Sequence, residues 1–410
     1  MNGFGLLGRC LSHSYSPLIH TELGNYEYKL FEKEPDEVED FLQGGNFEGI
    51  NVTIPYKKTV IPFCAGLSEA AKKIGSVNTI TRQTDGSLYG DNTDYFGFSY
   101  LLEKSGAELT GGKVLLLGSG GSSLTASAVL RDLSKMEIVV ISRNGTDNYD
   151  NIEKHGDAVM VVNTTPVGMY PENGTSPIKN LSIFLNCKII IDMIYNPLRT
   201  ELLLQAEDHG ISCTSGLSML VAQAKNAAEL FTGLSIPNEK IESITLKITA
   251  STRNIILIGM PGCGKSTTGK ILAEKTGREF ADTDKWVEKR TGKSIPEIFS
   301  KNGEETFRKL ENEALETLCK QSGYVIATGG GIVKHEKNRN IIRQNGIVVF
   351  IDRDIADLPV SGRPLSEKEG ITALAKARLP VYARWSDKTV KAAGAEETAE
   401  EIRKVITEGV

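Results

Sequence analysis

The sequence of 410 residues lacks the features that mark several classes of protein. It contains no run of about 18 apolar residues, so no segment is long enough to cross a bilayer as a helix. Its six cysteines form no Cys-x-x-Cys pair and its five histidines form no His-Glu-x-x-His motif, which argues against a zinc knuckle, a dithiol redox site or a zinc hydrolase. No signal peptide opens the chain, and the formal net charge of −5 leaves no basic excess for binding nucleic acid or an acidic membrane. We therefore expect a cytoplasmic protein with reduced cysteines and with no nucleic-acid or membrane partner.

What is present divides into blocks. Residues 1–106 alternate short apolar runs with helical patterns. Residues 107–216 contain continuous apolar runs of strand length with helical segments between some of them, which indicates a parallel sheet covered on both faces. A helix at about 217–240 returns to the first block, and 241–252 is a polar link with several Ser and Thr. Residues 253–410 have strands of their own, so we expect about two to three α/β domains.

The stretch GMPGCGKS, from Gly259 to Ser266, fits the pattern Gly-x-x-x-x-Gly-Lys-Ser/Thr between a strand-like run and the start of a helix. Glycines let backbone N–H groups approach a β- or γ-phosphate, Lys265 adds a positive charge, and the Ser266 hydroxyl holds Mg²⁺. The flanking strand and helix make a plain tight turn a poor alternative. The residues predicted to bind ATP are Gly259, Gly262, Cys263, Gly264, Lys265, Ser266 and Thr267.

The residues that follow offer groups for a phosphoryl acceptor. Asp282 and Asp284 stand two apart at the end of a short strand and therefore on one side of it, so that one can reach the metal and the other an acceptor hydroxyl. Arg308, Arg363 and Arg378 suit an acidic acceptor, because the guanidinium fork matches a carboxylate. Taken singly, each arginine is more often a solvated surface charge than a ligand-binding group.

In order along the chain, the Asp-x-Asp, Phe-Arg, Gly-Gly-Gly, Arg-Pro-Leu and Arg-x-Pro-x-Tyr elements resemble those of shikimate kinase, over essentially all of residues 252–410. The resemblance implies a P-loop α/β domain of the NMP-kinase type in which Lys265, Asp284 and Arg363 are catalytic, with Arg363 on a mobile lid. The lid segment is shorter than is usual in that family. The residues implied to hold Mg²⁺ are Ser266 and Asp282, and those implied to hold shikimate are Asp284, Arg308, Gly329, Gly330, Gly331 and Arg378.

A second glycine-rich turn, GSGGSS from Gly118 to Ser123, follows the apolar run VLLLG and opens a helix. Alone it is weak support for a dinucleotide site, and a structural turn is a fair alternative. The next strand ends at Ser142 and Arg143. In NAD sites an acid at this strand end binds the ribose 2′-hydroxyl, whereas an arginine suits a 2′-phosphate, so Arg143 favours NADP over NAD. Asp147 lies further on and is a poor substitute for such an acid.

The first block carries hydrogen-bonding groups that suit a polyhydroxy acid. Reduction of a ketone requires a hydride on carbon and a proton on oxygen, and a buried Lys–Asp pair such as Lys57 and Asp94 can supply the proton. Individually, such serines are usually caps or turns and such lysines are usually solvated. The candidate residues of this block are Ser14, Ser16, Thr53, Lys57, Asn78 and Asp94.

The motifs SHSYSP, NVTIPYK, GSVNT, GDNTDYFG, NTTPVGM and GLSMLVAQA resemble, in order, those of shikimate dehydrogenase over residues 1–240. The resemblance implies that Lys57 and Asp94 are the catalytic pair. Two departures concern the cofactor: the loop after Arg143 is short, and Ser-Arg-Asn replaces the usual Asn-Arg-Thr. The residues implied to hold the substrate are Ser14, Ser16, Thr53, Asn78, Asp94, Tyr195 and Gln223, and those implied to lie along NADP(H) are Gly118, Gly120, Gly121, Ser142, Arg143, Asn163, Thr165, Gly216 and Met219.

Together the two resemblances imply an α/β chain with a two-part dehydrogenase, made of a substrate domain and a Rossmann-like NADP domain, followed by a P-loop kinase domain with a parallel sheet. We therefore predict a bifunctional enzyme that reduces 3-dehydroshikimate to shikimate with NADPH and then phosphorylates shikimate with ATP and Mg²⁺. Three alternatives stay open: one half is inactive and serves as a binding or regulatory module, the dehydrogenase oxidises quinate, or the chain is a scaffold. A homodimer is also left open.

Overall fold

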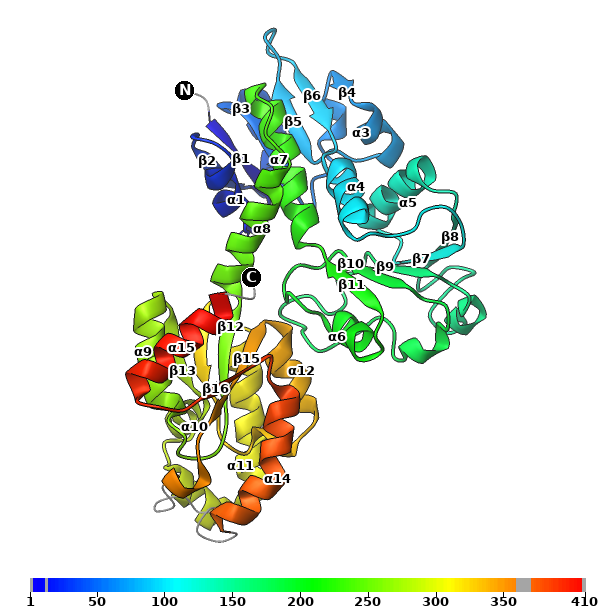
Figure 1. Ribbon diagram of the computed structural model, residues 1–410. Helices are drawn as coiled ribbons and strands as arrows, with labels where there is room; N and C mark the ends of the chain where they lie inside the picture. Colours follow the sequence, from blue (N-terminus) through cyan, green and yellow to red (C-terminus); the bar gives the residue numbers. More distant parts are fainter. Residues whose placement is uncertain (1–2, 12–13, 359–369, 408–410) are drawn as a thin grey trace. The chain divides into compact units, whose positions relative to one another are not determined.

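The computed structural model describes residues 3–11, 14–358 and 370–407 (Figure 1). The chain divides into two compact units. Unit 1 comprises residues 1–167, 176–195 and 205–247, and unit 2 comprises residues 168–175, 196–204 and 248–410. Among the described residues, no helix is both long enough and apolar enough to cross a membrane.

The first sheet of unit 1 is mixed and has the strand order β2-β1-β3-β5-β6-β4. Strand β1 pairs in parallel with β2 and β3, whereas β5 runs antiparallel to β3 and β6. Buried Leu7, Ile50 and Ile80 form part of its core. The strands are β1 (Gly3–Gly8), β2 (Tyr28–Glu32), β3 (Phe47–Val52), β4 (Gly66–Leu67), β5 (Thr79–Arg82) and β6 (Leu88–Asp91).

Helices connect and cover this sheet. Helix α7 packs on α4 and α1 and on strands β3 and β5, which belong to the first block of the sequence (Figure 1). Its alanines, such as Ala224 and Ala228, are buried and allow this close packing. The helices are α1 (Ser16–Leu23), α2 (Val38–Gly44), α3 (Glu69–Ile74), α4 (Asp94–Lys104) and α7 (Leu217–Thr232).

The second sheet of unit 1 is parallel throughout, as the apolar runs predict, with the order β11-β10-β9-β7-β8. The chain leaves β7 toward β8 on one side and returns to β9 on the other, so the strand order reverses at β7. Ligands of open α/β sheets bind beyond the carboxyl ends of the strands at such a point. The elements are β7 (Lys113–Leu117), α5 (Gly121–Leu133), β8 (Glu137–Ile141), β9 (Met160–Asn163), β10 (Ile189–Asp192) and β11 (Ser212–Ser215).

Unit 2 contains a five-stranded parallel sheet with the order β13-β14-β12-β15-β16. Helices α9 and α15 pack on each other, as do α11 and α12 (Figure 1). The strands are β12 (Asn254–Ile258), β13 (Glu279–Asp282), β14 (Tyr324–Ala327), β15 (Gly346–Asp352) and β16 (Lys388–Lys391). The helices are α9 (Lys265–Thr276), α10 (Thr283–Thr291), α11 (Ile295–Cys319), α12 (Lys337–Gln344), α14 (Ile371–Trp385) and α15 (Ala395–Thr407).

The segment 241–252, predicted as a polar link, lies in helix α8 (Glu239–Thr252). Ile241, Ile244 and Ile248 are buried. Their spacing of three and four residues is that of one helix face, and it outweighs the Ser and Thr content that suggested a link. Helix α6 (Glu201–Asp208) and helix α8 each contain residues of both units. The short 3-10 helices are η1 (Pro35–Glu37), η2 (Ile61–Phe63), η3 (Ile152–His155), η4 (Leu181–Ile183), η5 (Ile332–Lys334) and η6 (Ile355–Asp357).

Candidate active sites

The predicted Lys–Asp pair forms in unit 1. The Lys57 Nζ lies 2.6 Å from the Asp94 Oδ2. Lys57 follows β3 in a loop, and Asp94 begins α4, where the helix dipole favours its negative charge. Both side chains keep partial access to solvent, 32% for Lys57 and 19% for Asp94, so a substrate can reach the pair. The arrangement suits transfer of a proton to a ligand oxygen.

A buried hydrogen-bond network orients the amide of Asn78 beside this pair. The Asn78 Oδ1 accepts hydrogen bonds from the Thr93 backbone N–H at 2.7 Å and from the Thr79 Oγ1 at 3.0 Å. Because a backbone N–H only donates, the oxygen of the amide must face Thr93, and the Nδ2 remains to donate to a ligand. The Thr93 Oγ1 also donates to the Gln223 Oε1 at 3.4 Å, which joins α7 to the same network. Asn78 and Gln223, predicted separately, are thus brought together.

The two predicted serines lie at the start of helix α1: Ser16 is its first residue and Ser14 precedes it. The Ser14 Oγ accepts from the Ser16 backbone N–H at 3.2 Å, which forms the turn expected from Ser-x-Ser. The Tyr15 ring between them lies 5.6 Å, centre to centre, from the ring of Tyr195. Tyr195 follows β10, so a residue far away in sequence stands beside this turn. Burial, and then the neighbouring Tyr15, raise the pKa of the Tyr195 hydroxyl. The remaining residue of the set, Thr53, donates its backbone N–H to the Leu7 carbonyl at 2.9 Å.

The dinucleotide turn lies at the carboxyl end of β7, where the strand order reverses. Gly118 has φ +101°, and a Cβ there would lie 2.8 Å from the Thr165 Cγ2, so the turn requires glycine. A Cβ at Gly120 or Gly121 would meet nothing within 4 Å, which leaves the first turn of α5 open to an anion. The Asn163 Oδ1 accepts from the Thr165 backbone N–H at 3.0 Å. These groups fit the pyrophosphate of a dinucleotide.

Other predicted cofactor residues lie around the same sheet edge. Arg143 is exposed in the turn after β8, beside Ser142. The short loop predicted after it contains η3 and no α-helix. Gly216 caps α7, and a Cβ there would lie 2.1 Å from the Met193 carbonyl oxygen, so the start of α7 presses against the chain after β10. Met219 stands in the first turn of that helix.

In unit 2 the predicted phosphate-binding loop from Gly259 to Ser266, here called the P-loop, surrounds the side chain of Lys265. Gly259, Gly262 and Gly264 all have positive φ values, of 147°, 82° and 104°. Lys265 begins α9, is only 7% exposed, and donates from Nζ to the carbonyl oxygens of Gly259 and Met260, both at 2.9 Å. The ammonium is therefore held in the loop that a phosphate would enter.

The two predicted metal-binding residues meet at the start of α10. The Ser266 Oγ donates to the Asp282 Oδ2 at 2.6 Å. The Asp282 Oδ1 caps α10 by accepting from the backbone N–H of Asp284 at 2.9 Å. A hydroxyl and a carboxylate beside a phosphate-binding loop are the oxygen ligands that Mg²⁺ takes together with nucleotide phosphates and water.

A cavity of about 590 Å³ joins the P-loop to the predicted acceptor residues. Burial, then the nearby Glu311 and Asp282, raise the pKa of Asp284 to about 7. A Cβ at Gly329 would lie 2.3 Å from the Glu311 Oε1, and one at Gly331 would lie 2.0 Å from the Arg308 Nη1. Predicted residues that line the cavity are Gly262, Gly264, Lys265, Ser266, Thr267, Asp282, Asp284, Arg308, Gly329, Gly330, Gly331 and Arg378.

The two arginines in this cavity differ in their partners. The Arg308 Nη1 donates to the Glu311 Oε2 at 2.5 Å, and its Nη2 to the Glu304 Oε1 at 3.1 Å. The Arg378 Nη1 donates to the Gly330 carbonyl at 2.9 Å, while its Nη2 is buried with no partner among the described residues. An unpaired buried guanidinium N–H is costly, so this group suits an anionic ligand. Arg363 lies outside the described residues, as does most of the predicted lid.

Known proteins resemble both parts of the chain. The shikimate kinase family matches residues 261–407, and the shikimate dehydrogenase substrate binding domain matches residues 6–80. A shikimate dehydrogenase (NADP(+)) of Clostridium perfringens is 34% identical over 265 residues, which cover 60% of this chain and 97% of that protein. The chain belongs to the shikimate dehydrogenase family, with a shikimate kinase part fused to it.

Solved structures agree with this assignment. Shikimate dehydrogenase 1 of Peptoclostridium difficile is 35% identical with a TM-score of 0.55, and the match covers 60% of this chain and 97% of that one. Shikimate 5-dehydrogenase of Thermus thermophilus, in complex with NADP(H) and shikimate, is 29% identical with a TM-score of 0.55 and covers 60% and 99%. The predicted order, dehydrogenase first and kinase second, is thereby confirmed.

Sequence reasoning missed the two glutamates that hold Arg308 in the shikimate kinase part. Glu304 stands four residues before Arg308 and Glu311 three residues after it, so all three share one face of α11. That spacing was visible in the sequence. In the dehydrogenase part it also missed Thr93, which stands next to Asp94 and carries no signal of its own.

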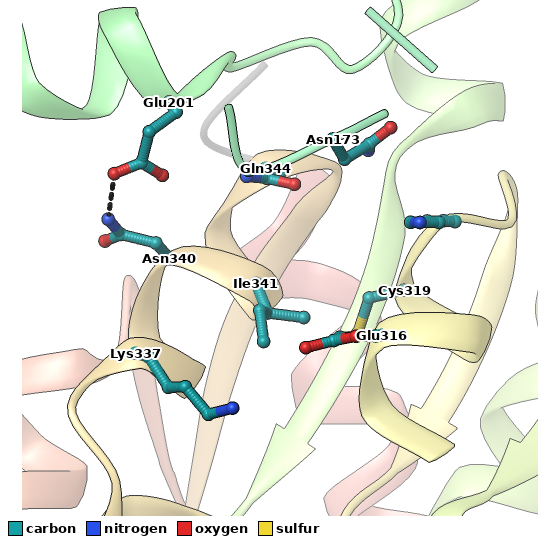
Figure 2. A pocket seen from close by; sticks show the side chains of 10 residues that line it. Asn173, Glu201, Glu316, Cys319, Lys337, Asn340, Ile341 and Gln344 are labelled. Carbon is teal, nitrogen blue, oxygen red and sulfur yellow. Dashed lines mark hydrogen bonds between the residues drawn. The ribbon is translucent and has the colours of Figure 1, made fainter. Parts of the chain in front are cut away.

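A second cavity in unit 2 contains none of the predicted residues (Figure 2). Its volume is about 320 Å³. The Asn340 Nδ2 donates to the Glu201 Oε1 at 2.8 Å across one side of it. The cavity is lined by Asn173, Gly174, Glu201, Glu316, Cys319, Lys320, Lys337, Asn340, Ile341 and Gln344.

Proposed function

We propose that the chain catalyses two consecutive reactions: NADPH-dependent reduction of 3-dehydroshikimate to shikimate, and ATP- and Mg²⁺-dependent phosphorylation of shikimate to shikimate 3-phosphate. The observation that supports the reduction is the ion pair of Lys57 and Asp94, whose Nζ and Oδ2 atoms lie 2.6 Å apart. The cavity that joins the P-loop to Asp284 supports the phosphorylation. We assign the substrate domain to 1–106 with the helix at about 217–240, the NADP domain to 107–216 and the kinase to 253–410; residues 241–252 belong to helix α8.

For the reduction, bound NADPH supplies the hydride. The Lys57 ammonium donates a proton to the ketone oxygen as that oxygen becomes a hydroxyl, and Asp94 holds Lys57 in place by their ion pair. The Asn78 Nδ2, turned outward by Thr93, donates to an oxygen of the substrate. The other residues proposed to contact the substrate are Ser14, Ser16, Thr53, Tyr195 and Gln223.

For the phosphorylation, Asp284 accepts the proton of the acceptor hydroxyl while that oxygen attacks the γ-phosphorus. A carboxylate whose pKa is about 7 is basic enough to take this proton near neutral pH. The Arg378 Nη2 and Arg308 bind the shikimate carboxylate. Lys265, which the loop holds through two carbonyls, would bind the phosphates of ATP, and Ser266 and Asp282 would hold Mg²⁺.

The test uses the intact chain with 3-dehydroshikimate, NADPH, ATP and Mg²⁺. Loss of nicotinamide absorbance and formation of shikimate 3-phosphate, identified by mass, are expected together. Lys57→Met should abolish NADPH oxidation but leave phosphorylation of added shikimate intact, and Lys265→Met should do the reverse. NADPH oxidation that stops at shikimate would make the kinase part inactive. Phosphorylation without NADPH oxidation would make the N-terminal part a binding module, and faster turnover of quinate than of shikimate would change its substrate.

A further inference from the structure

The turn after β8 brings an acidic residue to the strand end that selects the cofactor. The Ser142 backbone N–H donates to the Asp147 carbonyl oxygen at 3.1 Å, and the Gly145 N–H donates to the Ser142 carbonyl at 3.4 Å. These bonds close the turn, so the backbone of Asp147 lies against Ser142, the residue before Arg143, although Asp147 is several residues further along the chain. An acid at this strand end normally selects NAD, because it accepts from the ribose 2′-hydroxyl and repels a 2′-phosphate.

Two residues of η3 occupy this carboxylate. The Lys154 Nζ lies 2.6 Å from the Asp147 Oδ1, and the His155 Nε2 lies 2.9 Å from the same oxygen. Since a carboxylate only accepts, the His155 Nε2 carries the proton in this bond. The pKa of Asp147 lies below its ordinary value, first because of the hydrogen bond from Lys154 and then because of that from His155. The charge of Asp147 is therefore compensated within the turn.

We propose that Lys154 and His155 determine cofactor specificity indirectly: they neutralise Asp147, so that Arg143 can bind a 2′-phosphate beside it. Lys154 contributes the compensating charge, and His155 fixes the direction of the carboxylate. Neither residue needs to touch the cofactor. This inference rests on the proposed use of NADPH, which the glycine turn at Gly118 and the exposed Arg143 support.

The experiment measures dissociation constants for NADPH and NADH by nicotinamide fluorescence in the full-length protein, without turnover. Lys154→Met should weaken NADPH binding about five- to tenfold, as one uncompensated charge near a phosphate does. NADH binding should change less than about twofold, because NADH lacks the 2′-phosphate. In the background of Asp147→Asn, which has no charge to compensate, Lys154→Met should leave NADPH binding unchanged.

The matched control is Lys188→Met. Lys188 also forms a surface ion pair, at 2.7 Å with Glu108, but it precedes β10 and so stands at the opposite edge of the parallel sheet. Its replacement should alter neither dissociation constant. Thermal melting of each variant establishes that it folds.

Two results would overturn the inference alone. One is unchanged NADPH binding in Lys154→Met; the other is a loss that persists in the Asp147→Asn background, which would mean that Lys154 contacts the phosphate itself. A wild-type protein that binds NADH but not NADPH would instead overturn the proposed cofactor, whatever the variants do.

Discussion

Replacing Glu311 by Gln should let the kinase work at lower pH. In the proposed mechanism Asp284 must be unprotonated to accept the proton of the acceptor hydroxyl, and its pKa is raised to about 7 by burial and then by Glu311 and Asp282. Gln keeps the shape of Glu311 and can still accept from Arg308, but it has no negative charge. Removing a negative neighbour lowers the pKa of Asp284, so the base stays unprotonated further into the acid range.

The geometry at Gly329 sets the size of this effect. The Glu311 Oε1 and the Asp284 Oδ1 lie 2.3 and 3.0 Å from the point that a Cβ of Gly329 would occupy. The two oxygens are therefore within about 5 Å of each other, where two unit charges repel by about 3 kcal/mol at an effective dielectric constant of about 20. That corresponds to about two pKa units. Because Arg308 already offsets part of the Glu311 charge, we expect the acid limb to move by about one pH unit.

The assay is kcat/KM for shikimate at saturating ATP and Mg²⁺ between about pH 5 and pH 9. Glu304→Gln is the matched control, because Glu304 binds the same arginine but is 38% exposed and is not among the groups that raise the pKa of Asp284. An acid limb that stays in place in Glu311→Gln would refute the reasoning. So would an equal shift in Glu304→Gln, since the effect would then come through Arg308.

Three further predictions follow from named contacts. Thr93→Val removes the hydroxyl that donates to the Gln223 Oε1, so kcat/KM for 3-dehydroshikimate should fall about tenfold, mainly through KM, whereas Thr93→Ser should retain activity; equal losses in both variants would contradict this. Gly331→Ala places a Cβ 2.0 Å from the Arg308 Nη1, so KM for shikimate in the kinase assay should rise while NADPH oxidation is unchanged. Burial lowers the pKa of His20 from 6.5 to about 3, so the unfolded state binds more protons below about pH 6.5, and unit 1 should lose about 2 kcal/mol of stability by about pH 5. Urea titrations measure this loss, which His20→Gln should abolish.

Sequence patterns sufficed where one continuous stretch determines the structure. The P-loop from Gly259 to Ser266 and the turn at Gly118 each require a strand, a tight turn and a helix, and these are adjacent in the chain. The apolar runs predicted parallel sheets because only strands covered on both faces are apolar throughout. The pair of Lys57 and Asp94 was predicted through the family resemblance, since nothing in their spacing brings them together.

Other features depend on packing between distant segments. The orientation of the Asn78 amide follows from Thr93, and Tyr195 reaches the turn of Ser14 and Ser16 only because β10 ends beside it. Composition misled us at α8, where the helical spacing of buried isoleucines was the better guide. The position of Asp147 could not be predicted from the sequence either. Asp147 was judged a poor substitute for a cofactor-binding acid because it lies further along the chain, yet the closed turn brings its backbone against Ser142, next to Arg143.

The two glycine-rich turns differ because the phosphate groups that they are proposed to bind have different chemical roles. Both lie at the carboxyl end of an inner strand, β7 or β12, whose neighbours are reached by connections that leave in opposite directions. At β7 the proposed role is only to hold a pyrophosphate, for which open backbone at Gly120 and Gly121 and a helix start suffice. At β12 a phosphoryl group is transferred and its charge must be stabilised, so the helix begins with Lys265 and Ser266, and Asp282 stands beside them. The second turn therefore carries the side chains proposed to bind phosphate and Mg²⁺, where the first has glycine and serine.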